Sequence, residues 1–185
     1  MVSGALLGDS ILKNLPDVSL RALQKKFGLT HKPRLFCFGG YSTYDLISRS
    51  GMIEMIMDQE PCLDKLFLCS RSNDARTYPN GSVESRTCKL FEDYQNLISD
   101  LRKRYPRLMI YALPQPRRFL SKIFSERFPE NSNPEFIADQ NDIISLFQEK
   151  MLVSEEVSNF KFMPSPPLDV WKSIMADDGL HLTDL

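Results

Sequence analysis

The sequence predicts an α/β fold built around a mainly parallel sheet. Short apolar runs recur along the chain, and amphipathic helical patterns separate them. This alternation is typical of a sheet whose strands run in one direction and whose two faces are covered by helices. At 185 residues, with 42% hydrophobic and 25% charged residues, the chain has the size and composition of one globular domain.

The first element is predicted from the stretch Leu6–Leu12, where an apolar run ends in Gly8-Asp9-Ser10 and a helical pattern follows at once. Such a pattern indicates a buried strand that turns tightly into a helix. A helix is then predicted over residues 17–28, because Asp17 can cap its start and Gly28 can end it. Its apolar residues share one face: Leu20, Leu23 and Phe27.

The rest of the chain continues the alternation. Further strands are predicted at residues 34–38, 64–70, 108–113 and, more weakly, 159–163. Helices are predicted around 44–50 and 52–57, over 83–104, near 119–124, from Asn133-Pro134 onward, and for one or two turns after 168. The helix over 83–104 has a core stripe at spacings of three and four: Phe91, Tyr94, Ile98, Leu101 and Tyr105.

Three polar or glycine-containing stretches follow the first three predicted strands. In a parallel sheet, right-handed crossovers bring the carboxyl ends of all strands to one edge, so Ser10, Gly40 and Asn73 are expected to lie together. The backbone N–H of a serine at a helix start can also hold negative charge. Simpler roles stay open at this point: Ser10 as a helix N-cap and Asn73 as the first residue of an Asx turn.

A serine nucleophile needs a base, and the chain has only two histidines. His31 precedes Lys32-Pro33, where the chain enters a strand, so we expect it in a solvated loop at the opposite edge of the sheet. His181 follows Asp178 by three residues, and this spacing lets the carboxylate orient the imidazole. Asp177 is a rival carboxylate, and Asp178-Gly179 is also a common turn pair.

Four motifs in this order resemble those of the SGNH hydrolases, also called the GDSL esterase/lipase family. They span nearly the whole chain: Gly8-Asp9-Ser10, Gly39-Gly40, Ser72-Asn73-Asp74 and Asp178-Gly179-Leu180-His181. The resemblance implies a three-layer α/β/α sandwich with a five-stranded, flavodoxin-like sheet. It also implies a serine esterase, lipase or deacetylase that acts on acyl or acetyl esters of lipids or sugars through an acyl-enzyme.

The resemblance assigns roles to five positions. Ser10, Asp178 and His181 would form the catalytic triad. The oxyanion hole would consist of the Ser10 N–H, the Gly40 N–H and the Asn73 side-chain amide, with Gly39 as an alternative to Gly40 because the register of the pair is open by one residue.

One residue departs from the family pattern. The third motif usually reads Gly-x-Asn-Asp, and here Arg71 replaces the glycine. Arg71 could bind an anionic substrate group, narrow the pocket, lie on its rim or mark lost activity. The alternative function is therefore a non-catalytic binding or assembly module, as in esterase-like domains of retrotransposon or viral proteins. Arg71 and the basic pairs Lys25-Lys26 and Arg117-Arg118 favour that alternative.

Composition argues against several other classes. The net charge of −1 disfavours nucleic acid as a partner, and the basic residues 102–104 are explained by the end of a helix. The four cysteines form no CxxC pair, no metal or cofactor motif is apparent, and Cys37 and Cys69 are expected to be buried free thiols. Because no signal peptide or membrane span is apparent, a cytoplasmic location is expected. The oligomeric state is not predicted.

Overall fold

The computed structural model describes residues 1–9, 12, 15, 17–48, 51–69, 80–115, 117–119, 121–127, 129, 133–153, 159–167 and 169–170. Its five strands form one parallel sheet in the order β2-β1-β3-β4-β5. The strands are β1 (Ser3–Gly8), β2 (Arg34–Cys37), β3 (Leu63–Cys69), β4 (Met109–Ala112) and β5 (Phe160–Phe162). This is the predicted flavodoxin-like order.

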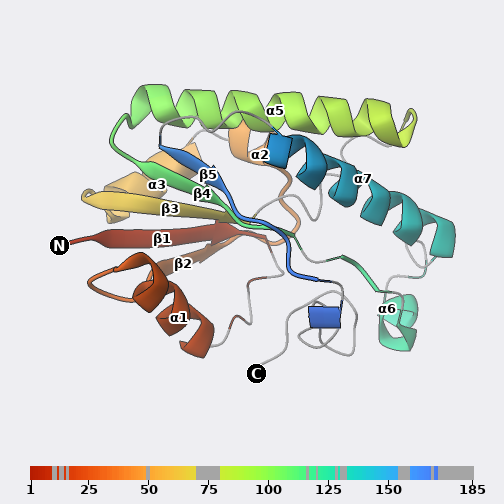
Figure 1. Ribbon diagram of the computed structural model, residues 1–185, viewed down its shortest axis with the longest axis horizontal. Helices are drawn as coiled ribbons and strands as arrows, with labels where there is room; N and C mark the ends of the chain where they lie inside the picture. Colours follow the sequence, from red (N-terminus) through yellow and green to blue (C-terminus); the bar gives the residue numbers. More distant parts are fainter. Residues whose placement is uncertain are drawn as a thin grey trace.

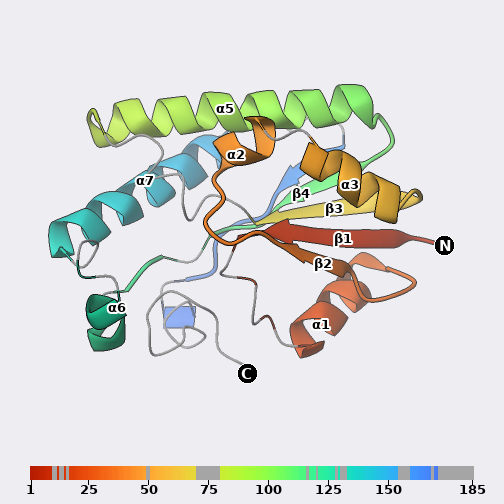
Figure 2. The ribbon, with the colours of Figure 1, turned by 180° about the vertical axis from the view of Figure 1, so that it is seen from behind.

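Helices cover both faces of the sheet (Figures 1 and 2). One face carries α2 (Thr43–Ser48), α3 (Gly51–Gln59), α5 (Val83–Arg104) and α7 (Pro134–Val153), and the other carries α1 (Asp17–Phe27). The short helix α6 (Lys122–Arg127) follows β4 beyond the end of the sheet. The architecture is therefore the expected three-layer α/β/α sandwich.

The alternation of side chains along β1 separates two cores. Ala5 and Leu7 face the larger core, which they share with α3, α5 and α7, whereas Leu6 faces a smaller core next to α1. All three side chains are fully buried, as expected for a central strand of a parallel sheet. In the smaller core, Phe27 of α1 packs edge-to-face on Phe67 and Tyr111, with ring centroids 4.7 Å apart in each pair.

The helix boundaries follow local signals in the sequence. Gly28 has φ +62°, the left-handed conformation that ends α1. Ser82 caps α5 by accepting a hydrogen bond from the Ser85 N–H. Asn133 caps α7 by accepting a hydrogen bond of 2.9 Å from the Glu135 N–H, and Pro134 is the first helical residue. The predicted turns after residue 168 lie largely outside the described residues.

Candidate functional site

Three neighbouring strands end at the same level of the sheet. Gly8, at the end of β1, is in register with Cys37 of β2 and with Cys69 of β3. The ladder between β1 and β2 continues one step further, since the Phe38 N–H donates a 2.9 Å hydrogen bond to the Gly8 carbonyl. Segments that leave these three strands therefore start side by side at the carboxyl edge, where α/β proteins bind ligands.

Gly8 is required by the close approach of its neighbours. A Cβ at this position would lie 2.7 Å from the Cys69 carbonyl oxygen and 2.3 Å from Cδ1 of Leu12. Directly after the strand the chain turns, and the Leu12 N–H donates a 3.2 Å hydrogen bond to the Asp9 carbonyl. Leu12 is thereby buried in the smaller core, so the turn after β1 is anchored against the sheet.

Asp9 is buried at this edge, with 1% of its surface exposed. Its position affects the thiol of Cys37 on the adjacent strand. Burial, and secondarily the negative charge of Asp9, raise the pKa of Cys37 to about 11. Cys37 is half-buried, whereas Cys69 is buried as predicted, and neither is in a disulfide. The expectation that both thiols are buried is therefore confirmed only for Cys69.

The Gly39-Gly40 pair forms a tight turn after β2. The Tyr41 N–H donates a 3.3 Å hydrogen bond to the Phe38 carbonyl, and Gly40 has φ +80°. This combination is a type II β-turn, which favours glycine at its third position. The turn hydrogen bond uses the Tyr41 N–H, so the Gly40 N–H is not needed to close the turn. Both glycines are exposed, and, apart from the adjacent residues of the chain, no atom of the described residues lies within 4 Å of where a Gly40 Cβ would be.

The segment after this turn is held by a capping box at the start of α2. The Ser42 hydroxyl accepts a 3.2 Å hydrogen bond from the Asp45 N–H, and the Asp45 carboxylate accepts a 2.8 Å hydrogen bond from the Ser42 N–H. Ser42 and Thr43 are buried, with 4% and 0% exposed. The turn thus connects two fixed points, the end of β2 and the start of α2.

On the other side of β3, the loop that follows β4 forms a series of hydrogen bonds with side chains of α7. The side chain of Asn141 accepts a hydrogen bond from the Arg118 N–H at 2.8 Å and donates one to the Arg118 carbonyl at 2.9 Å. Further along α7, the Ser145 hydroxyl accepts from Arg117, and Gln148 donates to the Gln115 carbonyl. Arg118 is 3% exposed, so only Arg117 of this basic pair is available as a surface charge.

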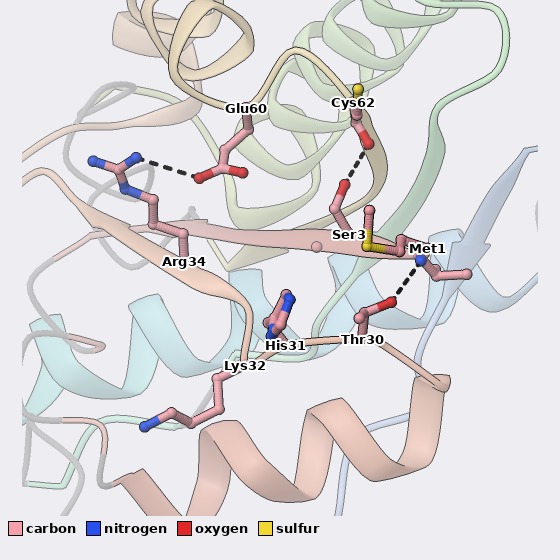
Figure 3. Close-up of a pocket in the computed structure, with 10 residues that line it drawn as sticks. Met1, Ser3, Thr30, His31, Lys32, Arg34, Glu60 and Cys62 are labelled. Carbon is pink, nitrogen blue, oxygen red and sulfur yellow. Dashed lines mark hydrogen bonds and ion pairs between the residues drawn. The ribbon is translucent and has the colours of Figure 1, made fainter.

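The opposite edge of the sheet carries a separate pocket of about 390 Å³ (Figure 3). It is lined by the start of β1, by the loop Thr30–Lys32, and by Arg34, Glu60 and Cys62. Lys32 pairs with Asp17 of α1, and Arg34 pairs with Glu60 at 3.3 Å. His31 is exposed here, at the amino edge, which confirms the prediction that it lies opposite the candidate site.

The predicted site is described only in part. Gly40 and Asp9 lie at the carboxyl edge, while Ser10, Arg71, Asn73, Asp178 and His181 are outside the described residues. Among the residues that the structure describes, no group of three His, Cys, Asp or Glu side chains could hold a metal ion. None of the described helices is both long enough and apolar enough to cross a lipid bilayer.

Comparison with known proteins gives matches among solved structures alone. No family model and no curated protein sequence matches the chain. A lipase from a goat rumen metagenome, Lip_vut3, is 16% identical with a TM-score of 0.63, and the match covers 98% of this chain and 90% of that one. A protein from Parabacteroides merdae, described as a GDSL-like lipase, is 17% identical with a TM-score of 0.59, covering 98% and 88%.

A third match is the acetyl xylan esterase AlAXEase, which is 18% identical with a TM-score of 0.55, over 97% of this chain and 91% of that one. At these identities the likeness concerns the fold, and it extends over nearly the whole of each chain. The parallel sheet order and these matches together confirm the predicted resemblance at the level of architecture: the chain has the fold of the SGNH (GDSL) hydrolases.

Proposed function

We propose that this protein is a serine ester hydrolase that works through an acyl-enzyme. The observation that carries the proposal is the common level at which β1, β2 and β3 end, with Gly8 in register with both Cys37 and Cys69. Ser10 follows Gly8 by two residues, Gly40 follows Cys37 by three, and Asn73 follows Cys69 by four. These short separations allow the three positions to lie close to one another at one edge, which supports the proposal.

The proposed reaction has two steps. The Ser10 hydroxyl attacks the ester carbonyl while His181 takes its proton, and Asp178 holds the imidazole in the required tautomer. The C–O bond to the alcohol then breaks, and His181 returns the proton to the leaving alcohol. In the second step, water activated by His181 attacks the acyl-serine ester, which releases the acid and restores Ser10.

The negative oxygen formed in each step needs fixed hydrogen-bond donors. We assign the Gly40 N–H as one of them, because the type II turn leaves it outside the turn hydrogen bond. The Ser10 N–H and the Asn73 amide are the other proposed donors. Arg71 is assigned to the rim, as a residue that can contact an anionic substrate group.

A labelled fluorophosphonate tests the nucleophile directly. We expect covalent labelling of the wild-type protein at Ser10, complete loss of labelling in Ser10→Ala, and unchanged labelling in Ser85→Ala. Ser85 is a matched control, because it is an exposed serine in the first turn of α5. Peptide mapping by mass spectrometry identifies the labelled residue. Labelling that persists in Ser10→Ala would place the nucleophile elsewhere.

Hydrolysis of short acyl esters is the second part of this test. Wild-type protein should hydrolyse acetyl and butyryl esters, and Ser10→Ala should not. A folded wild-type protein that neither reacts with fluorophosphonate nor hydrolyses any ester would instead favour the non-catalytic binding module.

A further inference from the structure

The pocket of about 390 Å³ at the amino edge of the sheet has no part in the proposed ester hydrolysis (Figure 3). It forms where β1 has irregular neighbours on both sides. Toward β2, Val2 and Thr30 exchange hydrogen bonds of 2.8 and 2.9 Å, and regular pairing begins only at Ala5 and Arg34. Toward β3, the register shifts near the start of the strand. These irregularities leave room for a pocket at this edge.

Hydrogen bonds hold the walls of this pocket. The Ser3 N–H donates a 2.8 Å hydrogen bond to the Asp64 carboxylate, and the Ser3 hydroxyl donates to the Cys62 carbonyl. The Leu63 N–H donates a 3.0 Å hydrogen bond to the Glu60 carbonyl, which fixes the turn between α3 and β3. A pocket with fixed walls loses little conformational freedom when a ligand binds.

Two contacts orient the guanidinium of Arg34, one of the lining residues. Nη1 of Arg34 lies 3.3 Å from a carboxylate oxygen of Glu60, and the guanidinium carbon lies 5.3 Å from the centroid of the Phe36 ring. Among the described residues, the ion pair occupies Nη1 alone, so Nη2 and Nε can donate to a second anion. A guanidinium presents these donors as a planar fork that matches the oxygens of a phosphate or a carboxylate.

Two more nitrogen-containing side chains, His31 and Lys32, line the pocket from the loop before β2. Figure 3 shows the His31 ring between this loop and the start of β1. Lys32 pairs with Asp17, and the two side chains are 42% and 52% exposed. Ion pairs that are this exposed are weak, so an anion in the pocket can compete with Asp17 for the Lys32 ammonium.

The part of the chain that supplies this wall is strongly positive. Residues 17–34 include five lysine or arginine residues and one aspartate, a net charge of +4, whereas the whole chain has a net charge of −1. The facing wall, residues 60–64, contributes two acids, Glu60 and Asp64. The balance around the pocket is therefore positive, which attracts anionic ligands.

We propose that this pocket binds a small organic molecule through a phosphate group. A phosphate monoester has a charge of about −2 at neutral pH and three acceptor oxygens, which match the donors of Arg34, Lys32 and His31. The pocket is larger than a phosphate group, so room remains beside Val2 and Gly4 for the rest of the ligand. The inference does not depend on the proposed ester hydrolysis, because the two sites lie at opposite edges of the sheet.

Three compounds with the same carbon skeleton test the anionic group: glycerol, glycerate and glycerol 3-phosphate. The readout is the imidazole proton signal of His31 at low salt, which His31→Ala identifies because the chain has only two histidines. We expect glycerol 3-phosphate to shift this signal saturably, glycerate to bind about tenfold more weakly, and glycerol to have no effect. A shift of the His181 signal without one of His31 would place the phosphate elsewhere and overturn the proposal.

Variants of the ion pair at the pocket should act in opposite directions. Arg34→Gln should weaken the binding of glycerol 3-phosphate about tenfold, because charge-assisted hydrogen bonds are lost. Glu60→Gln should strengthen it about threefold, because a competing acid is removed. Lys122→Gln and Glu126→Gln are matched controls, since they remove the same charges from an exposed ion pair on α6, beyond the other end of the sheet. Both should bind like the wild type.

Thermal unfolding without ligand shows whether each variant is folded, and Lys32→Gln replaces Arg34→Gln if the latter is not. Equal weakening in Arg34→Gln and Lys122→Gln would overturn the proposal, since the effect would be one of net charge. Glycerate that binds as tightly as glycerol 3-phosphate would overturn the choice of phosphate. The absence of a saturable His31 shift up to about 50 mM glycerol 3-phosphate would remove the site. Ser10→Ala should bind glycerol 3-phosphate like the wild type, so this test is independent of the esterase proposal.

Discussion

Two glycines shape the candidate site for different physical reasons. At Gly8 the limit is space, because a Cβ would meet the Cys69 carbonyl and the Leu12 side chain. At Gly40 no atom of the described residues, chain neighbours aside, would crowd a Cβ, and the limit is the backbone conformation, with φ +80°. From sequence, both residues are simply glycines near a turn. The structure shows that Gly8 is required by limited space and Gly40 by its backbone conformation.

Alanine substitutions should reveal this difference. Gly8→Ala should reduce the free energy of unfolding by about 1–3 kcal/mol, as overpacking does. Gly40→Ala should reduce it by about 1 kcal/mol, the cost of a left-handed conformation in a residue with a Cβ. Gly51→Ala is the control and should lose no stability, since Gly51 starts α3 without positive φ and, among the described residues, no atom beyond its chain neighbours lies within 4 Å of its Cβ position. Urea unfolding measures all three, and a loss at Gly51 as large as at Gly8 would contradict the steric argument.

The four cysteines differ in exposure and, at Cys37, in pKa. Cys62 and Cys88 are exposed, while Cys69 is buried and the pKa of Cys37 is raised to about 11. At pH 8 a thiol with that pKa is deprotonated in about one molecule in a thousand, and the thiolate is the reactive form. A disulfide reagent at pH 8 should therefore react quickly with two thiols in the native protein and with all four after unfolding. Fast native labelling of Cys37, located by mass spectrometry, would contradict this assignment.

At the scale of elements, most helices and strands could be predicted because their signals are local. The stripe in α5 repeats over the length of the helix, and Tyr94, Ile98 and Leu101 of that stripe are buried. Phe91 and Tyr105, at the same spacing, are half-buried and complete the contact. The ends of α1 and α7 were predictable because Gly28 and Asn133-Pro134 end or begin a helix by their own chemistry.

The loop after β4 has no such local signal. Its position depends on a polar stripe on α7, where Asn141, Ser145 and Gln148 bind the loop across 23 to 33 residues of sequence. From sequence, Arg117-Arg118 reads as a basic surface pair, and the structure buries Arg118. Contacts between side chains and distant backbone follow from tertiary structure, so periodicity and propensity do not predict them.

At the scale of the whole molecule, the parallel sheet gives the protein two edges with different surroundings. The carboxyl edge has the Gly8 and Gly40 turns, and the amino edge has the pocket near His31. This separation follows from the strand order and could be predicted once the strands were recognised as parallel. The relative positions of Ser10, Asn73, Asp178 and His181 remain predictions that rest on the motifs.

The two histidines test whether the chemistry belongs to the carboxyl edge and not to the amino edge of the sheet. If His181 is the general base, His181→Ala should lower kcat for ester hydrolysis by at least about 10²-fold, because proton transfer from Ser10 is lost. His31→Ala should leave kcat within about twofold, since an exposed histidine at the amino edge cannot reach a proton at the carboxyl edge. Steady-state kinetics at pH 8, with thermal unfolding of each variant as the control for folding, measures both. Equal losses in the two variants would mean that the effect is on folding, while a loss in His31→Ala alone would move the chemistry to the amino-edge pocket.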